Sequence, residues 1–291
     1  MTLEQLRIFV AVAEREHMTA AARAVNVTQS AASAAIAALE ARHGVRLFDR
    51  VGRGIILTDT GRLFLEEARG VLARAATAEQ ALDDMAGMRR GVLRLVASQT
   101  TAAYWLPPIL AAFHARYPQV TIDLAIANTE IAATRVREGE AELGIVEGAV
   151  DDPVLGLWPI GEDRLVLVQA AAPQRPVDAD TLRAARWVLR EAGSGTRSVL
   201  DEALRRLAID PALLDVALVL PSNESVRTAV EHGAGIAALS ALVVAPAIAA
   251  GALHALPVDL GTRPFYGLRH KARYRSRAVQ ALLDLIGEGM A

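Results

Sequence analysis

Apolar residues in the first 44 positions recur at helical spacing and predict three short helices. The first begins with a capping box of Thr2 and Gln5 and ends near Glu16. We expect Thr19 to cap the second helix and Thr28 to cap the third. The residues of the third helix expected to face the core are Ala32, Ile36 and Leu39.

Two short apolar segments follow Gly44, at 45–48 and 55–57, and flank a turn that carries Arg50 and Arg53. This pattern predicts a small hairpin. Three helices and a hairpin have the dimensions of a winged helix-turn-helix, whose third helix could enter a DNA major groove. A three-helix protein-interaction domain is the alternative for this head.

A heptad pattern predicts a long helix over residues 59–88. Its seam consists of Phe64, Ala68, Val71, Ala75, Ala78, Leu82 and Met85. Such a helix is about 45 Å long and is poorly stable alone. We therefore expect it to pair with a second copy of the chain, although a partner within the chain stays open.

From Gly91 onward, short apolar runs alternate with helical patterns, which predicts an α/β fold with largely parallel sheets. We expect strands near 92–97, 120–126, 143–146, 164–169, 187–190, 216–220, 235–239, 252–257 and 265–269. We expect helices near 102–116, 130–138, 195–207, 223–232, 242–249 and 275–287. Two lobes of about 80 to 100 residues suit the length.

The composition excludes some kinds of chemistry and indicates where the protein acts. The chain has no cysteine, which excludes disulfides and thiolate chemistry. Its N-terminus is amphipathic, unlike a secretory signal, so we expect a cytoplasmic protein. Residues 234–257 carry no formal charge, but Ser240, Pro246 and Gly251 interrupt them, which favours buried elements over a membrane span.

The formal net charge of −2 does not by itself indicate nucleic-acid binding. Its distribution is more informative, because residues 41–62 hold five arginines against two aspartates. This basic patch directly follows the third helix and is expected to contact phosphates.

Hydroxyl and amide groups follow three predicted strands, each just before a helix. The three runs are Ser98–Gln99–Thr100–Thr101, Gly193–Ser194–Gly195–Thr196–Arg197 and Ser222–Asn223–Glu224–Ser225. Free backbone amides at helix N-termini can bind an anion, with Arg197 as a charge partner. Glu147 follows a further strand and could order a donor group of the ligand. The alternatives are ordinary helix caps for the runs and an exposed turn for Glu147.

An enzyme is less well supported. The six histidines are scattered without metal-ligand spacing or a nucleophile partner. The glycines of 233–238 follow a helix and lead into a strand, the reverse of the order in a dinucleotide fingerprint. We expect no cofactor, no metal and no catalytic residue.

The whole chain resembles LysR-type transcriptional regulators. The segments that carry the resemblance are Leu3–Phe9, the helix-turn-helix through Leu39–Glu40, Leu47–Arg50, Leu57–Gly61 and the two-lobed remainder. The run Leu189–Arg197 is also similar to the branch that contains regulators of sulfur assimilation and autotrophic carbon fixation.

The resemblance implies a winged helix-turn-helix over 1–58, a linker and dimerisation helix over 59–90, and an effector domain over 91–291. The effector domain would consist of two Rossmann-like lobes and be similar to periplasmic binding proteins. The first lobe would span 91–161 and 266–291, and the second 162–265. The expected partners are double-stranded promoter DNA, a small anionic effector, further copies in a homodimer or homotetramer, and RNA polymerase, with no membrane.

By matching position, the resemblance implies DNA contacts from Gln29, Ser30, Ser33, Arg50 and Arg53. It places Thr100, Thr101, Glu147, Thr196 and Asn223 at the cleft between the lobes, with Ser98 and Gln99 close behind. One departure is that the middle of the reading helix holds alanines at 34, 35, 37 and 38, where many relatives carry basic or long polar residues. The sequence thus predicts a DNA-binding regulator, with a cytoplasmic solute-binding protein bearing a protein-interaction head as the alternative.

Overall fold

The computed structural model describes residues 1–51, 54–85, 91–173 and 176–289. They form two compact units, Met1–Leu82 and Asp83–Ala291. Within the described residues, no helix is both long enough and apolar enough to cross a bilayer.

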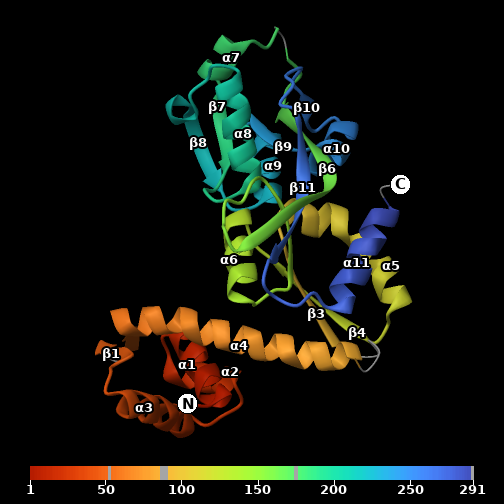
Figure 1. Ribbon diagram of the computed structural model, residues 1–291. Helices are drawn as coiled ribbons and strands as arrows, with labels where there is room; N and C mark the ends of the chain where they lie inside the picture. The colour runs from red at the N-terminus through yellow and green to blue at the C-terminus, as the bar shows by residue number, and fades with distance from the viewer. Residues whose placement is uncertain (52–53, 86–90, 174–175, 290–291) are drawn as a thin grey trace. The chain divides into compact units, whose positions relative to one another are not determined.

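The first unit is a winged helix-turn-helix followed by a long helix (Figure 1). Its elements are α1 (Leu3–Arg15), α2 (Met18–Ala24), α3 (Gln29–His43), β1 (Phe48–Val51), β2 (Gly54–Leu57) and α4 (Asp59–Met85). Strands β1 and β2 pair antiparallel, so the predicted hairpin is confirmed.

Three aromatic rings join the parts of this unit. The ring centroid of Phe9 in α1 lies 5.5 Å from that of Phe48 in the hairpin and 4.8 Å from that of Phe64 in α4. The expected core residues of α3 are buried with them. Because they share one buried core, α3, the hairpin and the start of α4 hold fixed positions relative to one another.

The predicted caps are mostly confirmed. Thr2 forms the capping box with Gln5, and the Thr28 side chain accepts a hydrogen bond from the Ala31 amide. The prediction that Thr19 caps the second helix is wrong. That helix begins two residues earlier, where Nδ1 of His17 accepts a hydrogen bond from the Ala20 amide at 3.2 Å. A histidine is an uncommon cap, so pattern alone favoured the threonine.

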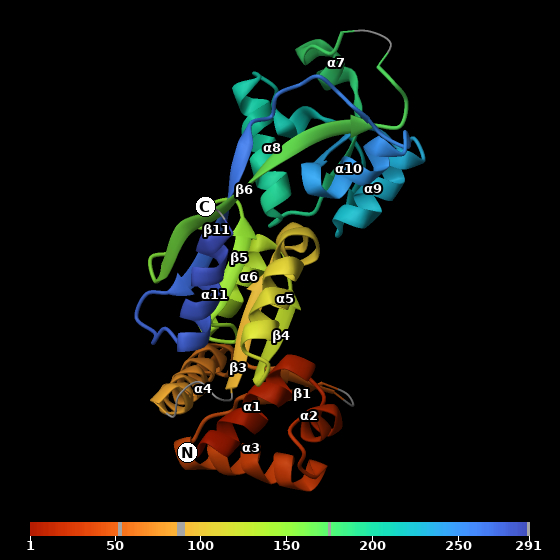
Figure 2. The ribbon, with the colours of Figure 1, turned by 90° about the vertical axis from the view of Figure 1, so that its right-hand side faces the viewer.

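The second unit has two lobes that share a seven-stranded sheet (Figures 1 and 2). Its strand order is β10-β6-β11-β5-β3-β4, and β9 pairs with β6. The strands are β3 (Gly91–Ala97), β4 (Val120–Ile126), β5 (Leu143–Glu147), β6 (Leu155–Gln169), β9 (Ala237–Ser240), β10 (His254–Ala255) and β11 (Thr262–His270). A separate parallel pair consists of β7 (Arg186–Arg190) and β8 (Asp215–Leu220).

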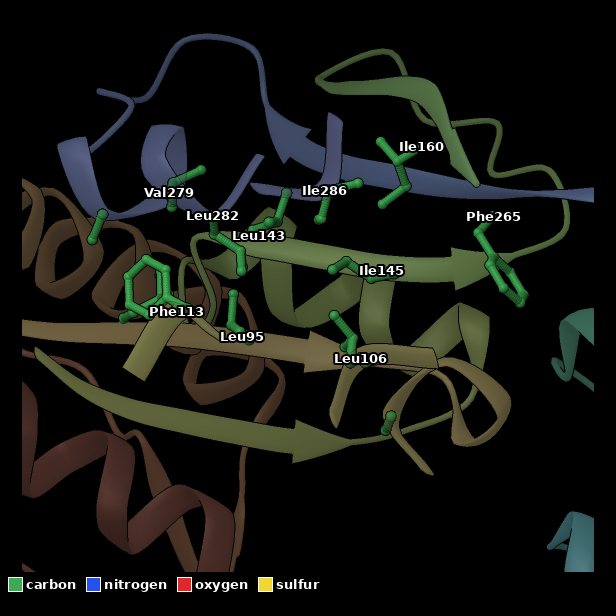
Figure 3. Packing of buried hydrophobic residues seen from close by; sticks show 14 of the residues in the cluster. Leu95, Leu106, Phe113, Leu143, Ile145, Ile160, Phe265, Val279, Leu282 and Ile286 are labelled. Carbon is green, nitrogen blue, oxygen red and sulfur yellow. The ribbon is translucent and has the colours of Figure 1, made fainter. Parts of the chain in front are cut away.

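Helices flank these strands. They are α5 (Leu106–Arg116), α6 (Thr129–Glu138), α7 (Ala179–Ala184), α8 (Gly195–Arg206), α9 (Asn223–Glu231), α10 (Ala241–Ala249) and α11 (Arg277–Glu288), with a π-helical turn η1 (Thr101–Trp105) and a 3₁₀ turn η2 (Pro211–Leu213). In the first lobe, α11 and α5 lie against the strands. Val279, Leu282 and Ile286 of α11 lie over Leu143 and Ile145 of β5 (Figure 3).

The sheet is only partly parallel. Strands β4, β3 and β5 run parallel, but β11 runs antiparallel to both β5 and β6. The strand expected at 164–169 begins at Leu155 instead, because its first part pairs with β11. Gly156, Pro159 and Gly161 lie in this first part, and because glycine and proline are uncommon inside strands, the sequence pattern did not indicate a strand there. A Cβ on Gly161 would lie 2.9 Å from the Trp105 ring, so the glycine is needed for close packing.

Candidate functional site: a DNA-reading head and a closed cleft

The N-terminal end of α3 is accessible in the first unit. Gln29 and Ser30 are exposed, and Ser33 is half-buried. Arg50 is exposed on β1, whereas Arg53 lies outside the described residues. Four of the five residues predicted to contact DNA are therefore described, and none of the four is buried.

The middle of α3 offers few polar groups. Ala34, Ala37 and Ala38 are exposed there, and Arg42 and His43 lie in the last turn of the helix. The described residues that are predicted to contact DNA thus lie in the first two turns of α3 and on the hairpin.

Five of the residues predicted for the cleft lie where strands of the first lobe end, namely Ser98–Thr101 after β3 and Glu147 at the end of β5. Ser98 follows β3, and its hydroxyl is hydrogen-bonded to that of Thr101 at 3.0 Å. Thr101 Oγ1 also donates to the carbonyl oxygen of Ile145 in β5 at 2.9 Å. These hydroxyls are buried, and they tie the end of β3 to the end of β5.

Hydrogen bonds join this edge directly to the second lobe. The Gln99 amide group donates to the carbonyl oxygen of Pro221 at 2.8 Å and accepts from the backbone amide of Asn223 at 2.9 Å. The Asn223 side chain donates to Thr100 Oγ1 at 3.0 Å. Three of the predicted residues, Gln99, Thr100 and Asn223, thus make hydrogen bonds between the lobes, and the cleft is closed here.

A tyrosine beside them completes this contact. The hydroxyl of Tyr104 in η1 donates to Glu224 of α9 at 3.1 Å. Burial and the negative charge of Glu224 raise the pKa of Tyr104 above its usual value, so the phenol keeps its proton and remains a donor.

A second contact between the lobes depends on glycine. The carbonyl oxygen of Glu147, at the end of β5, lies only 1.7 Å from the position that a Cβ on Gly195 would take. The amide of Glu130 also donates to the carbonyl oxygen of Gly193 at 3.3 Å. The start of α8 therefore packs directly on the backbone of the first lobe. A pocket of about 360 Å³, lined by Thr129 and Ser198 among others, lies beside this contact.

A buried ionic cluster, missed in the sequence, lies where the chain passes between the lobes. Arg263 of β11 is 1% exposed and donates to Asp163 of β6 at 2.7 and 2.9 Å. It also donates to Thr196 Oγ1 at 3.0 Å and lies 3.6 Å from Oε1 of Glu147. The sequence gives little signal for this cluster, because β11 also carries Arg269 and His270, and the partner of Arg263 is 100 residues away.

A second buried arginine was also missed. Arg190 follows the apolar run of β7, is 5% exposed, and donates to the side-chain oxygen of Asn223. It makes two further hydrogen bonds to Glu191, at 2.8 and 2.9 Å. Arg190 therefore fixes the amide orientation with which Asn223 meets Thr100. Arg197, in contrast, pairs with Asp201 one turn along α8 at 2.7 Å, and its part in the cleft stays a prediction.

Glu191 gives this arrangement a pH dependence. Burial opposes ionisation of Glu191, but the hydrogen bonds and charge of Arg190 outweigh it and hold its pKa below the usual value. The stabilisation is therefore present above the ordinary glutamate pKa and is lost as the pH falls through the lowered one.

We expect Glu191→Gln to flatten the acid side of a plot of unfolding free energy against pH. Exposed Glu202→Gln is the control, and equal curves for Glu191→Gln and wild type would contradict the assignment.

Comparison with known proteins identifies both units. Residues 3–62 match the model of the bacterial regulatory helix-turn-helix protein, lysR family, and residues 86–291 match that of the LysR substrate binding domain. The chain belongs to the LysR family. It is accordingly a transcriptional regulator with an effector-binding domain and not an enzyme, and the predicted family and fold are confirmed.

LysR relatives match along nearly the whole chain. An uncharacterized HTH-type transcriptional regulator, YeiE of Escherichia coli K12, is 34% identical over 98% of this chain and 96% of its own length. A probable RuBisCO transcriptional regulator of Cyanophora paradoxa is 32% identical over 98% of this chain and 91% of its own length. The match of residues 3–62 of this chain to the lysR-family helix-turn-helix argues against the solute-binding alternative.

Solved LysR structures share the fold. Full-length CbnR complexed with its target DNA has a TM-score of 0.69 and 23% identity, with all of both chains covered. The regulatory domain of CcmR from Synechocystis PCC6803, in complex with 2-PG, has a TM-score of 0.62 and 27% identity over 68% of this chain and 97% of that one.

Proposed function

We propose that this LysR regulator binds promoter DNA through α3 and the hairpin, and that a small anionic metabolite in the cleft changes the arrangement of its oligomer on that DNA. The observation that carries the proposal is the closed contact between the lobes. The groups predicted to bind a ligand are the same groups that hold the lobes together, so a ligand can act by replacing those bonds. The DNA complex of CbnR and the 2-PG complex of CcmR support the two halves of this proposal.

Binding to DNA depends on a few groups. Gln29, Ser30 and Ser33 in the first two turns of α3 would contact base edges or phosphates, and Arg50 and Arg53 would contact phosphates. Because the middle of α3 is alanine-rich, a single head has few charged contacts. Affinity then requires two heads on a two-fold DNA site.

We expect Arg50→Ala to weaken binding to all DNA sequences and to reduce the salt dependence of affinity. Loss of one phosphate contact lowers the slope of log K against log salt by about 0.9. Titrations of operator and random duplexes at several salt concentrations measure this. Arg116→Ala, an exposed arginine in α5, is the control and should leave the slope unchanged. Ser33→Ala should alter preference among sequences instead, and an unchanged slope in Arg50→Ala would contradict the role of the hairpin.

Two exposed apolar surfaces support a homodimer or homotetramer. Of the seam predicted on α4, Phe64 and Ala68 pack into the core of the first unit instead, whereas Val71, Leu82 and Met85 are exposed. Leu63 is exposed as well, at 72%, and Met85 at 80%. The strand β8 also leaves apolar side chains exposed along one edge of the second lobe, at Val216, Leu218 and Val219. A second copy would cover both surfaces. In this proposal α4 is the dimerisation helix between the head (1–58) and the effector domain (91–291), which would divide into lobes of 91–161 with 266–291 and of 162–265.

Regulation requires that the DNA-bound oligomer has two arrangements of different affinity for the ligand. The direct test is a footprint of the full-length protein on the DNA upstream of its own gene, with and without a panel of small anions. A shifted or shortened footprint with one anion supports the proposal, and an unchanged footprint across the panel overturns the effector half of it. The proposal also includes contact with RNA polymerase at the promoter and action in the cytoplasm.

We expect Thr100→Val to keep DNA affinity but to blunt the effector response. Valine matches threonine in shape, but it removes the oxygen that accepts from Asn223 and would contact the ligand. The footprint at saturating effector measures this. Thr228→Val, on the exposed side of α9, is the matched control and should respond like the wild type. A full response in Thr100→Val would contradict the placement of the ligand.

A further inference from the structure

One polar atom in the cleft is left without a partner by the contacts described above. The Glu147 side chain is 3% exposed, and its Oε2 makes no hydrogen bond with any described residue. Its Oε1 lies 3.6 Å from Arg263, beyond hydrogen-bond distance. Buried carboxylate oxygens are usually paired with a donor, so a ligand that offers a donor to Oε2 would satisfy it.

The buried arginines near Glu147 make their hydrogen bonds to other residues. Arg263 donates twice to Asp163 and once to Thr196, and Ser240 donates to the other oxygen of Asp163. One guanidinium thus faces two buried carboxylates. The other buried arginine of the site, Arg190, is paired with Glu191. Any anion placed here adds negative charge to a cluster that already has an excess of it, so a hydrogen bond that the anion donates to the carboxylate is needed to offset that cost.

Neutral donors for an anion lie close by. Gly195 packs on the backbone of Glu147, and it opens a helix of 12 residues. The Ser194 side chain does not cap this helix, and the amide of Ser198 is the first to make a helical hydrogen bond, to the Ser194 carbonyl oxygen. The helix N-terminus therefore offers amide donors. Arg263 connects it to the Glu147 side chain, because its guanidinium donates to Thr196 Oγ1 at 3.0 Å and lies 3.6 Å from Glu147 Oε1.

We propose that the cleft selects an oxyanion that still carries a hydrogen-bond donor, such as a hydrogen phosphate group, and that this donor binds Oε2 of Glu147. The oxyanion is held by neutral amides and hydroxyls, and its proton satisfies the carboxylate. A fully ionised oxyanion of the same shape is rejected, because it faces Glu147 with a lone pair. This inference rests on the proposed function only in taking the cleft as the effector site.

Inorganic phosphate and sulfate are suitable probes, because they share size and tetrahedral shape. Near neutral pH phosphate retains a proton and sulfate does not. Calorimetric titration of the full-length protein with each anion, at equal ionic strength, compares their affinities. We expect phosphate to bind at least about tenfold more tightly than sulfate, since sites built around one hydrogen bond reject analogues that lack it.

Two variants test whether Glu147 causes the discrimination. Glu147→Gln replaces an acceptor oxygen by an amide that can donate, so the preference for phosphate should disappear or reverse. Glu147→Asp keeps the acceptor and should keep the preference at weaker affinity. Glu162→Gln, an exposed glutamate on β6, is the matched control and should behave as the wild type.

Several outcomes overturn the inference. Equal affinity for the two anions would do so, and so would no binding of phosphate. An unchanged preference in Glu147→Gln would also do so, because the anion would then bind elsewhere on the chain. Footprints distinguish this failure from failure of the proposed function. Discrimination that depends on Glu147, together with footprints that no anion changes, would sustain the ligand inference and overturn regulation through the cleft.

Discussion

Replacing Arg263 with methionine is expected to lower the free energy of unfolding of the second unit by about 3–5 kcal/mol, the usual effect of breaking a buried ion pair. The substitution removes the cation that faces Asp163 and Glu147 while both carboxylates stay buried. It also removes the hydrogen bond to Thr196. Denaturant unfolding followed by tryptophan fluorescence measures the loss, because Trp105, Trp158 and Trp187 all belong to this unit.

An exposed arginine gives the matched control. Arg186 lies 3.5 Å from Asp215, and both side chains are more than 60% exposed. Arg186→Met should change the free energy of unfolding by no more than about 0.5 kcal/mol. In the double variant Arg263→Met with Glu147→Gln, the loss should be smaller than the sum of the two single losses, because one stranded charge is gone. Equal losses in Arg263→Met and Arg186→Met would show that the buried cluster does not stabilise the fold.

The cluster around Arg263 also shows where sequence reasoning ends. Thr100 and Asn223 could be assigned to one cleft, because each follows a strand and precedes a helix, which is where ligands bind in α/β folds. The structure brings them within 3.0 Å of each other. Arg263 and Asp163 lie inside strands, where a charge is indistinguishable from one that faces solvent. Only the antiparallel pairing of β6 with β11 shows that they face each other in the interior.

Local chemistry was predicted best in the head. Thr28 and the hairpin could be predicted, because helix caps and turns depend on residues within a few positions of each other. His17 was not readable, since its role as a cap depends on where α2 begins. The conformation of the cleft was not predictable either. The same hydroxyls and amides serve equally well for a ligand or for the opposite lobe, and the sequence does not tell which partner they have.

Replacing Gly195 with alanine is expected to force the two lobes apart at the start of α8. The new Cβ would lie 1.7 Å from the carbonyl oxygen of Glu147 and 2.7 Å from Oγ1 of Thr129, and neither backbone can yield without moving its lobe. Overpacking of this kind costs about 1–3 kcal/mol, and more where only backbone can move. The amide of Glu130, which donates to Gly193 beside this contact, should exchange its hydrogen faster as the contact loosens.

Gly287→Ala in α11 separates this effect from the general effect of alanine in a helix. Nothing lies within 4 Å of a Cβ at position 287, so the control should gain about 0.5–1 kcal/mol from the better helix former. Opposite changes in melting temperature for the two variants, with faster exchange at Glu130 only in Gly195→Ala, are the expected result. If Gly195→Ala instead melts like Gly287→Ala, the lobes do not contact each other at this point in solution.

The groups that close the lobes are those proposed to bind the effector. A Gly195→Ala protein, in which the lobes are held apart, should therefore also show an altered footprint without any effector.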